Sequence, residues 1–172
     1  DLSAQAFPFG TSREIDLGCG FVRATRITYV GELGWELLIP ADLAVHVHDT
    51  IAEAGQEFGL RPAGYHALDS LRMEKAYRSW GHDISAGDTP LEAGLGFAVA
   101  WDKPGGCVGL EALRRQRAAG LRRQLVAIAL ESSESLLYHN EPIWRDGKLV
   151  GRVCSGMFGH TLGVSLGLGY LT

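Results

Sequence analysis

The stretch Ile27-Thr28-Tyr29-Val30-Gly31-Glu32-Leu33-Gly34-Trp35-Glu36-Leu37 places two glycines between two apolar runs. Glycine adopts backbone conformations that other residues avoid, so this pair predicts a reversal of the chain. The flanking runs, Phe21 to Tyr29 and Trp35 to Ile39, have the composition of strands. We therefore expect two strands joined by a tight connection, with Tyr29 and Glu36 on either side of one loop.

An aromatic hydroxyl and a carboxylate beside one loop suit a flat, amidine-like ligand. The Glu36 carboxylate can accept two parallel hydrogen bonds, one from a ring N–H and one from an exocyclic amine. A guanidinium or a pterin presents that edge. The alternative is a surface hairpin with an exposed Glu36. We interpret the second acid, Glu32, as a solvated charge at the tip of the turn.

Further blocks follow in a fixed order along nearly the whole chain. They are residues 1–9, 67–84, 90–96, 153–156, 159–163 and 168–170. Together with the opening stretch, they resemble the folate-binding aminomethyltransferase family. That family includes the T protein of the glycine cleavage system and the C-terminal folate-binding parts of dimethylglycine and sarcosine dehydrogenases.

The resemblance implies an α+β fold class. It implies the second half of a folate-binding aminomethyltransferase domain, residues 1–121, followed by a small antiparallel β-barrel domain, residues 122–172, which need not be complete. The sequence pattern also changes near Arg122, because short strand-like runs separated by Asn, Asp and Gly follow this position. One of them contains the turn Arg145-Asp146-Gly147-Lys148.

Carried over residue by residue, the resemblance implies that Glu36 holds the pterin edge of tetrahydrofolate and that Tyr29 lies beside the ring. The family's catalytic Asp lies upstream of the matched region, so no catalytic residue is assigned within this chain. The flavin fingerprint Gly-x-Gly-x-x-Gly is absent from the sequence, so FAD is expected only in an upstream domain outside this chain.

The resulting hypothesis is the tetrahydrofolate-binding C-terminal portion of an amine-demethylating enzyme, similar to dimethylglycine or sarcosine dehydrogenase. It would accept a one-carbon unit onto folate and be inactive as an isolated fragment. Two alternatives stay open: the aminomethyltransferase (T protein) of the glycine cleavage system, and a non-catalytic folate-binding module. Leu68 disfavours the T protein, which usually carries an arginine there.

The expected partners are a reduced folate and an upstream flavin domain of the same polypeptide. Half of a folded unit exposes apolar surface and strand edges, so the fragment is also expected to self-associate. The formal charge of -4 gives no basic footprint for nucleic acid, and we interpret Arg114, Arg115, Arg122 and Arg123 as solvated. No apolar run reaches the length of a membrane span, and a cytoplasmic location is the expectation.

Cys19, Cys107 and Cys154 are widely spaced, so we interpret them as buried or idle thiols, and no metal site is predicted. Apolar periodicity predicts an amphipathic helix from about Asp42 to Gly59, a second opened by Pro62, and a third from Leu110 to Gly120. Residues 1–20 are predicted to form a loop-rich lead-in to a strand. Arg72 and Glu74 are expected in an internal salt-bridge network, whereas the adjacent residues His82 and Asp83 are expected to point apart.

Overall fold

The computed structural model describes residues 1–18 and 20–172, so the interpretation of Cys19 as an idle thiol lies outside the described residues. The described chain forms two compact units, residues 1–68 and 69–172.

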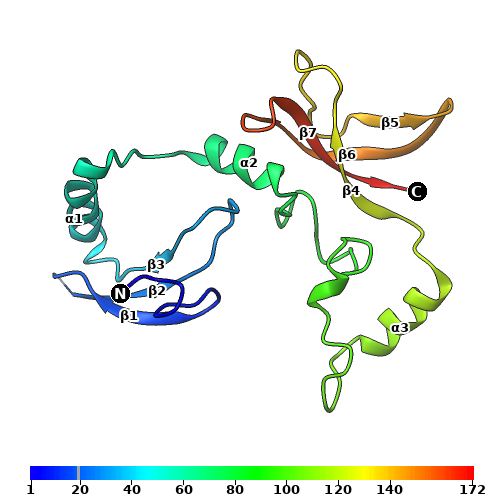
Figure 1. The fold of residues 1–172 in the computed structure, drawn as a ribbon. Helices are drawn as coiled ribbons and strands as arrows, with labels where there is room; N and C mark the ends of the chain where they lie inside the picture. Colours follow the sequence, from blue (N-terminus) through cyan, green and yellow to red (C-terminus); the bar gives the residue numbers. More distant parts are fainter. Residues whose placement is uncertain (19) are drawn as a thin grey trace. The chain divides into compact units, whose positions relative to one another are not determined.

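The first unit contains a three-stranded antiparallel sheet of order β1-β2-β3 (Figure 1). Its strands are β1 (Ser12–Asp16), β2 (Phe21–Thr25) and β3 (Glu36–Leu38). Residues 1–20, expected as a loop-rich lead-in to a strand, also contain β1, which the sequence did not predict. Most of its side chains are exposed, so the strand carries little apolar periodicity and is defined by its pairing with β2.

One face of this sheet is packed and the other is open. Val22 and Ala24 are each 1% exposed, and the guanidinium of Arg13, which pairs opposite Ala24, lies 5.0 Å from the centre of the Phe7 ring. Phe7 is itself fully buried, so it covers this face. Phe21, at 62% exposure, points to the other face because successive strand residues alternate.

The helix expected after Asp42 is present as α1 (Ala44–Gly55), continued by a short 3-10 turn, η1 (Gln56–Phe58). Val47 is fully buried and anchors the apolar side of the helix. The second helix, α2 (Tyr65–Glu74), begins three residues after Pro62 and spans the point where the two units divide.

The second unit begins with the last turns of α2 and continues through the 3-10 turn η2 (Gly96–Ala98) and helix α3 (Leu110–Ala119). A four-stranded antiparallel sheet of order β4-β7-β6-β5 then completes it (Figure 1). The strands are β4 (Gln124–Ala129), β5 (Pro142–Arg145), β6 (Lys148–Gly159) and β7 (Val164–Leu171).

The β5–β6 hairpin turns at Asp146 and Gly147, which both have positive φ (52° and 73°). Two positive φ values define the type I′ turn that the Asp-Gly pair predicts. The core of the unit gathers Met73 from α2 with strand residues Leu125, Leu166 and Leu168. The predicted α+β class with a small C-terminal barrel-like domain is confirmed.

The division of the chain at residues 121 and 122 into two domains stays a prediction. The boundary between the compact units falls between Leu68 and Asp69, because Met73 near the end of α2 packs in the core of the C-terminal sheet. Within the described residues, no helix is both long and apolar enough to cross a membrane.

Candidate functional site

The loop between β2 and β3 carries the residues singled out by the sequence. It runs over residues 26–35, so it is longer than the tight connection we expected, because β2 ends at Thr25 and β3 begins only at Glu36. Gly31 has a φ of 75° and makes the reversal. The Thr28 hydroxyl accepts a hydrogen bond from the Val30 N–H at 3.2 Å, which tightens the approach to this turn.

Arg26 fixes the base of the loop. Its Nη1 donates to the Phe7 carbonyl at 2.5 Å, and its guanidinium carbon lies 5.5 Å from the centre of the Trp35 ring. The Phe7 and Trp35 rings meet edge to face at 6.4 Å. No role was predicted for Arg26 from the sequence. The only sequence signal for Arg26 was its position directly before the stretch that begins at Ile27.

Glu36 is the first residue of β3 and pairs opposite Thr25. Its side chain is exposed, and among the described residues its carboxylate has no hydrogen bond or ion pair. By strand alternation it lies on the open face of the sheet with Leu38, which is 67% exposed. Its carboxylate is therefore free to accept hydrogen bonds from a ligand.

Tyr29 lies within the loop and is half-buried, whereas Glu32, just beyond the Gly31 reversal, is exposed as expected. The structure thus places Tyr29 on the loop and Glu36 at its exit. The cavities beside α3, beside α1 and in the C-terminal sheet are lined by other residues. Glu36 thus lies on an open surface outside these cavities, as in the alternative of a surface hairpin with an exposed Glu36, and its role in binding a ligand stays a prediction.

A buried ion-pair network lies in the second unit, as expected for Arg72. Arg72 is 4% exposed and Asp83 1% exposed, and Arg72 Nη1 donates to Asp83 Oδ2 at 2.7 Å. Arg72 also donates to Asp69 at 3.0 Å and to the Ser155 hydroxyl at 3.2 Å. His82 is exposed, so it points away from the buried Asp83. The network links helix α2 to strand β6 and has a structural role.

Glu74 holds the turn between β6 and β7. Its Oε1 accepts hydrogen bonds from the Thr161 N–H at 2.7 Å and the Leu162 N–H at 3.3 Å. Burial alone would raise the pKa of the Glu74 carboxyl, but these hydrogen bonds and nearby Lys75 outweigh it and lower the pKa. The Glu74 carboxylate is thus stabilised in its charged form.

Arg123 is not simply solvated, contrary to our interpretation from the sequence. Its Nη2 lies 2.7 Å from Asp88 Oδ1, and its guanidinium carbon lies 4.5 Å from the centre of the Tyr170 ring. Burial, followed by the charge of Asp88, raises the pKa of Tyr170. Burial likewise raises the pKa of the Cys154 thiol, so Cys154 is a poor nucleophile.

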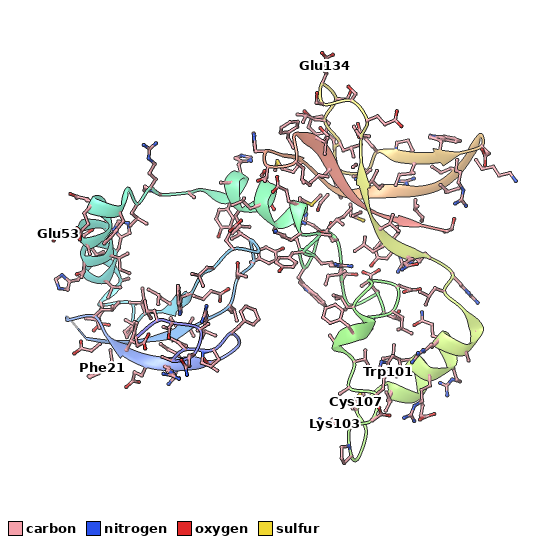
Figure 2. All side chains as sticks on the ribbon, viewed as in Figure 1. Phe21, Glu53, Trp101, Lys103, Cys107 and Glu134 are labelled. Carbon is pink, nitrogen blue, oxygen red and sulfur yellow. The ribbon has the colours of Figure 1, made fainter. Side chains whose placement is uncertain are left out.

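An open hollow of about 720 Å³ lies between the loop that precedes α3 and the helix itself. Trp101, Lys103 and Cys107 mark its loop side (Figure 2). The guanidinium of Arg117 lies 5.2 Å from the centre of the Trp101 ring, and Cys107 is an exposed free thiol. Within residues 1–18 and 20–172 there is no group of three His, Cys, Asp or Glu side chains placed to hold a metal ion.

Two family models match the chain. The GCVT N-terminal domain matches residues 1–103, and the glycine cleavage T-protein C-terminal barrel domain matches residues 123–172. The chain belongs to the glycine cleavage T-protein (GCVT) family. The resemblance to aminomethyltransferases is thereby confirmed, and sarcosine and dimethylglycine dehydrogenases are among the relatives.

Individual relatives cover the chain almost completely. It is 44% identical to 4-methylaminobutanoate oxidase (formaldehyde-forming) of Paenarthrobacter nicotinovorans and 45% identical to mitochondrial sarcosine dehydrogenase of Homo sapiens, in each case over 99% of this chain. It spans about a fifth of the length of these relatives, 21% and 18% respectively. The solved structure of glycine cleavage system aminomethyltransferase T from Bartonella henselae matches with a TM-score of 0.85 and 25% identity, over 99% of this chain and 46% of that chain.

Proposed function

We propose that this chain is the tetrahydrofolate-binding C-terminal portion of a larger amine-demethylating enzyme of the sarcosine or dimethylglycine dehydrogenase type. Membership of the GCVT family supports the class. The observation that carries the proposal is the family match over residues 1–103, a range that contains both Tyr29 and Glu36, and the exposed carboxylate of Glu36 is accessible to a ligand.

The residues fit the chemistry of a reduced folate. The pterin edge offers a ring N–H and an exocyclic amine, and a carboxylate accepts both at once. Glu36 would hold this edge, and Tyr29 would lie beside the ring. Bound tetrahydrofolate would supply the ring nitrogen that accepts the one-carbon unit. This chain contributes the orientation of the pterin, and the general acid or base belongs to a segment outside it.

FAD does not fit these residues. A dinucleotide fold needs parallel strands joined by helical crossovers, whereas both sheets in the described part of the chain are antiparallel. We therefore place the flavin in an upstream domain of the same polypeptide and route no step through it here. The sarcosine and dimethylglycine dehydrogenases to which this chain is similar are much longer proteins, which supports that arrangement.

Leu68 continues to disfavour an aminomethyltransferase of the glycine cleavage system, because it replaces a guanidinium on the ligand side with an apolar side chain. We retain the division into a partial folate domain, residues 1–121, and a barrel domain, residues 122–172, as part of the proposal. We also retain the cytoplasmic location, although the matched human dehydrogenases are named as mitochondrial.

Calorimetric titration with (6S)-5-formyltetrahydrofolate, a stable reduced folate, tests the site. It should be made on this chain and on the longer polypeptide that carries it. Glu36→Gln keeps the size of the side chain but removes its charge. A hydrogen bond to a charged group contributes about 1.5 to 3 kcal/mol, so the dissociation constant should rise roughly ten- to hundredfold.

Glu32→Gln is the matched control, because Glu32 is an exposed acid on the same loop. It should leave the affinity within about twofold, since a solvated charge makes only a small contribution to binding. Equal folate affinity for Glu36→Gln and the unmodified protein would remove Glu36 from the site. Loss of affinity in both variants would indicate a general effect of loop charge.

A further inference from the structure

The segment that follows helix α1 folds back along the helix. The Leu60 N–H donates to the Gly55 carbonyl at 3.0 Å, and the Gly59 N–H donates to the Gln56 carbonyl at 3.1 Å. Gly59 has a left-handed backbone, with φ 70° and ψ 29°. These features define a Schellman motif, in which an apolar residue after the glycine packs back on the helix.

Gly55 lets this return segment approach the helix closely. A Cβ atom at Gly55 would lie 2.4 Å from Leu60 Cδ2 and 2.6 Å from Leu60 Cβ, so only glycine leaves room for Leu60 here. Leu60 is fixed against the last turn of α1, and Arg61 and Pro62 follow it beside the helix. The direction of the segment is therefore determined by the cap.

A cavity of about 360 Å³ lies between this return segment and the helix, within the first unit. Its volume falls in the range of small-molecule sites, about 300 to 1,000 Å³. Its wall is mainly apolar, and two polar side chains lie at its rim. The lining residues are Ile39, Val47, His48, Ile51, Ala52, Leu60, Arg61 and Pro62.

The two polar side chains differ in their partners. His48 Nδ1 lies 3.0 Å from the Asp49 carboxylate, so any positive charge on His48 is balanced locally. Arg61 is exposed and makes no hydrogen bond or ion pair with the described residues. The rim therefore carries one uncompensated cation beside an apolar wall.

We infer that this cavity, defined by α1, Ile39 and Leu60–Pro62, binds a small amphipathic carboxylate such as a medium-chain fatty acid. The hydrocarbon body would lie against Ile39, Ile51 and Leu60, where it loses contact with water. The carboxylate would receive hydrogen bonds from the Arg61 guanidinium, whose planar fork matches that group.

This site is separate from the one proposed for folate. Glu36 lies on the open face of the sheet, whereas Val47 is fully buried on the apolar side of α1. None of the residues lining the cavity is used in the folate proposal. Failure of one proposal therefore leaves the other untouched, because their variants and probes do not overlap.

A titration of the whole chain with n-octanoate, followed by two-dimensional amide NMR, tests the inference. n-Octylammonium has the same hydrocarbon tail and the opposite charge. Octanoate should shift the amide resonances of Ile51, Ala52 and Leu60 saturably, and octylammonium should not. Arg61→Gln should weaken octanoate binding about fivefold, the effect of one charge contact at an exposed rim.

Ala52→Leu should fill the cavity and abolish the response to octanoate, and it keeps a good helix former at this position. Ala54→Leu is the matched control: Ala54 is exposed on the same helix and does not line the cavity, so binding should persist. Glu53 lies between Ala52 and Ala54 in the sequence, and its exposed side chain points outward from α1 (Figure 2).

Three results would overturn the inference. The first is the absence of saturable shifts, or shifts unaffected by Ala52→Leu. The second is an equal response to octanoate and octylammonium, which would leave the carboxylate without a role. The third is a set of shifts that follow protein concentration in the absence of octanoate, which would assign the cavity to a second copy of the chain.

Discussion

Replacing Arg72 with methionine should destabilise the second unit by about 3 to 5 kcal/mol. The Arg72 side chain is only 5% exposed, and that of its partner Asp83 is fully buried. Methionine would preserve much of the volume of the side chain but leave the Asp83 carboxylate in the interior without its cation. The same substitution removes donors to Asp69, Ser155 and the Tyr77 carbonyl.

The magnitude follows from the environment of Asp83. Its Oδ2 accepts from Arg72 at 2.7 Å and from the Ser79 N–H at 2.8 Å, and its Oδ1 has no partner among the described residues. After the substitution, one backbone N–H would remain to solvate a buried charge. One hydrogen bond to a charged group contributes about 1.5 to 3 kcal/mol, which is less than the cost of uncovering the carboxylate.

Urea unfolding followed by tryptophan fluorescence measures the effect as a lower midpoint. The double variant Arg72→Met with Asp83→Leu removes both charges, so its destabilisation should be smaller than the sum of the two single effects. Arg114→Met is the control, because Arg114 is half exposed and its pair with Glu111 lies on the surface. That control should cost less than about 1 kcal/mol.

A loss below about 1 kcal/mol for Arg72→Met would refute the reasoning, because it would show that water reaches Asp83 in the folded protein. Additivity in the double variant would refute it as well. In that case the two side chains would act independently and the buried ion pair would make no contribution of its own.

Three other substitutions test separate features. The pKa of Glu74 is lowered in the folded state, so its contribution to stability is present above the unfolded value near 4.5 and is lost as pH falls through the lower folded value; Glu74→Gln should remove that part of the acid dependence in urea unfolding. Gly156→Ala would put a Cβ 2.0 Å from the Leu137 carbonyl oxygen and should cost more than about 2 kcal/mol by thermal unfolding. Phe21→Ser should weaken self-association about tenfold in sedimentation velocity, because Phe21 is an exposed apolar residue on the open face of the first sheet (Figure 2).

Each of these three predictions has an outcome that would contradict it. An unchanged acid profile for Glu74→Gln would show that other carboxylates dominate the acid dependence. Gly64→Ala adds a Cβ that meets nothing within 4 Å, so a cost equal to that of Gly156→Ala would point to a generic loss of glycine. A protein that is monomeric before Phe21 is replaced would end the expectation of self-association.

The β5–β6 hairpin and α3 were predictable because their signals are local. Asp146 and Gly147 encode a type I′ turn by themselves, and the charged stretch from Leu110 forms a helix that buries little besides Leu110. Strand β1 was missed because its side chains are mostly exposed and its identity depends on the register with β2. The loop over residues 26–35 was expected to be tighter because the ends of strands β2 and β3 depend on pairing, not on composition.

In the candidate site, too, residue types could be interpreted from the sequence, whereas contacts between distant residues could not. The chemistry of Tyr29 and Glu36 could be stated from residue types and from the family resemblance. The contact of Arg26 with Phe7 and Trp35 could not, because Phe7 and Arg26 are nineteen residues apart in the chain. The same is true of Arg72 and Ser155, which meet across eighty-three residues.

The sequence by itself determined the family and the α+β class with a small antiparallel C-terminal domain. These depend on residue identity, turn chemistry and motif order, which act over short distances along the chain. Only the tertiary structure decided that Glu36 stays unpaired on an open face and that Asp83 is buried with Arg72. It also showed the cavity that lies behind α1. Burial and pairing depend on which distant segments meet, and packing free energy, not local preference, selects those contacts.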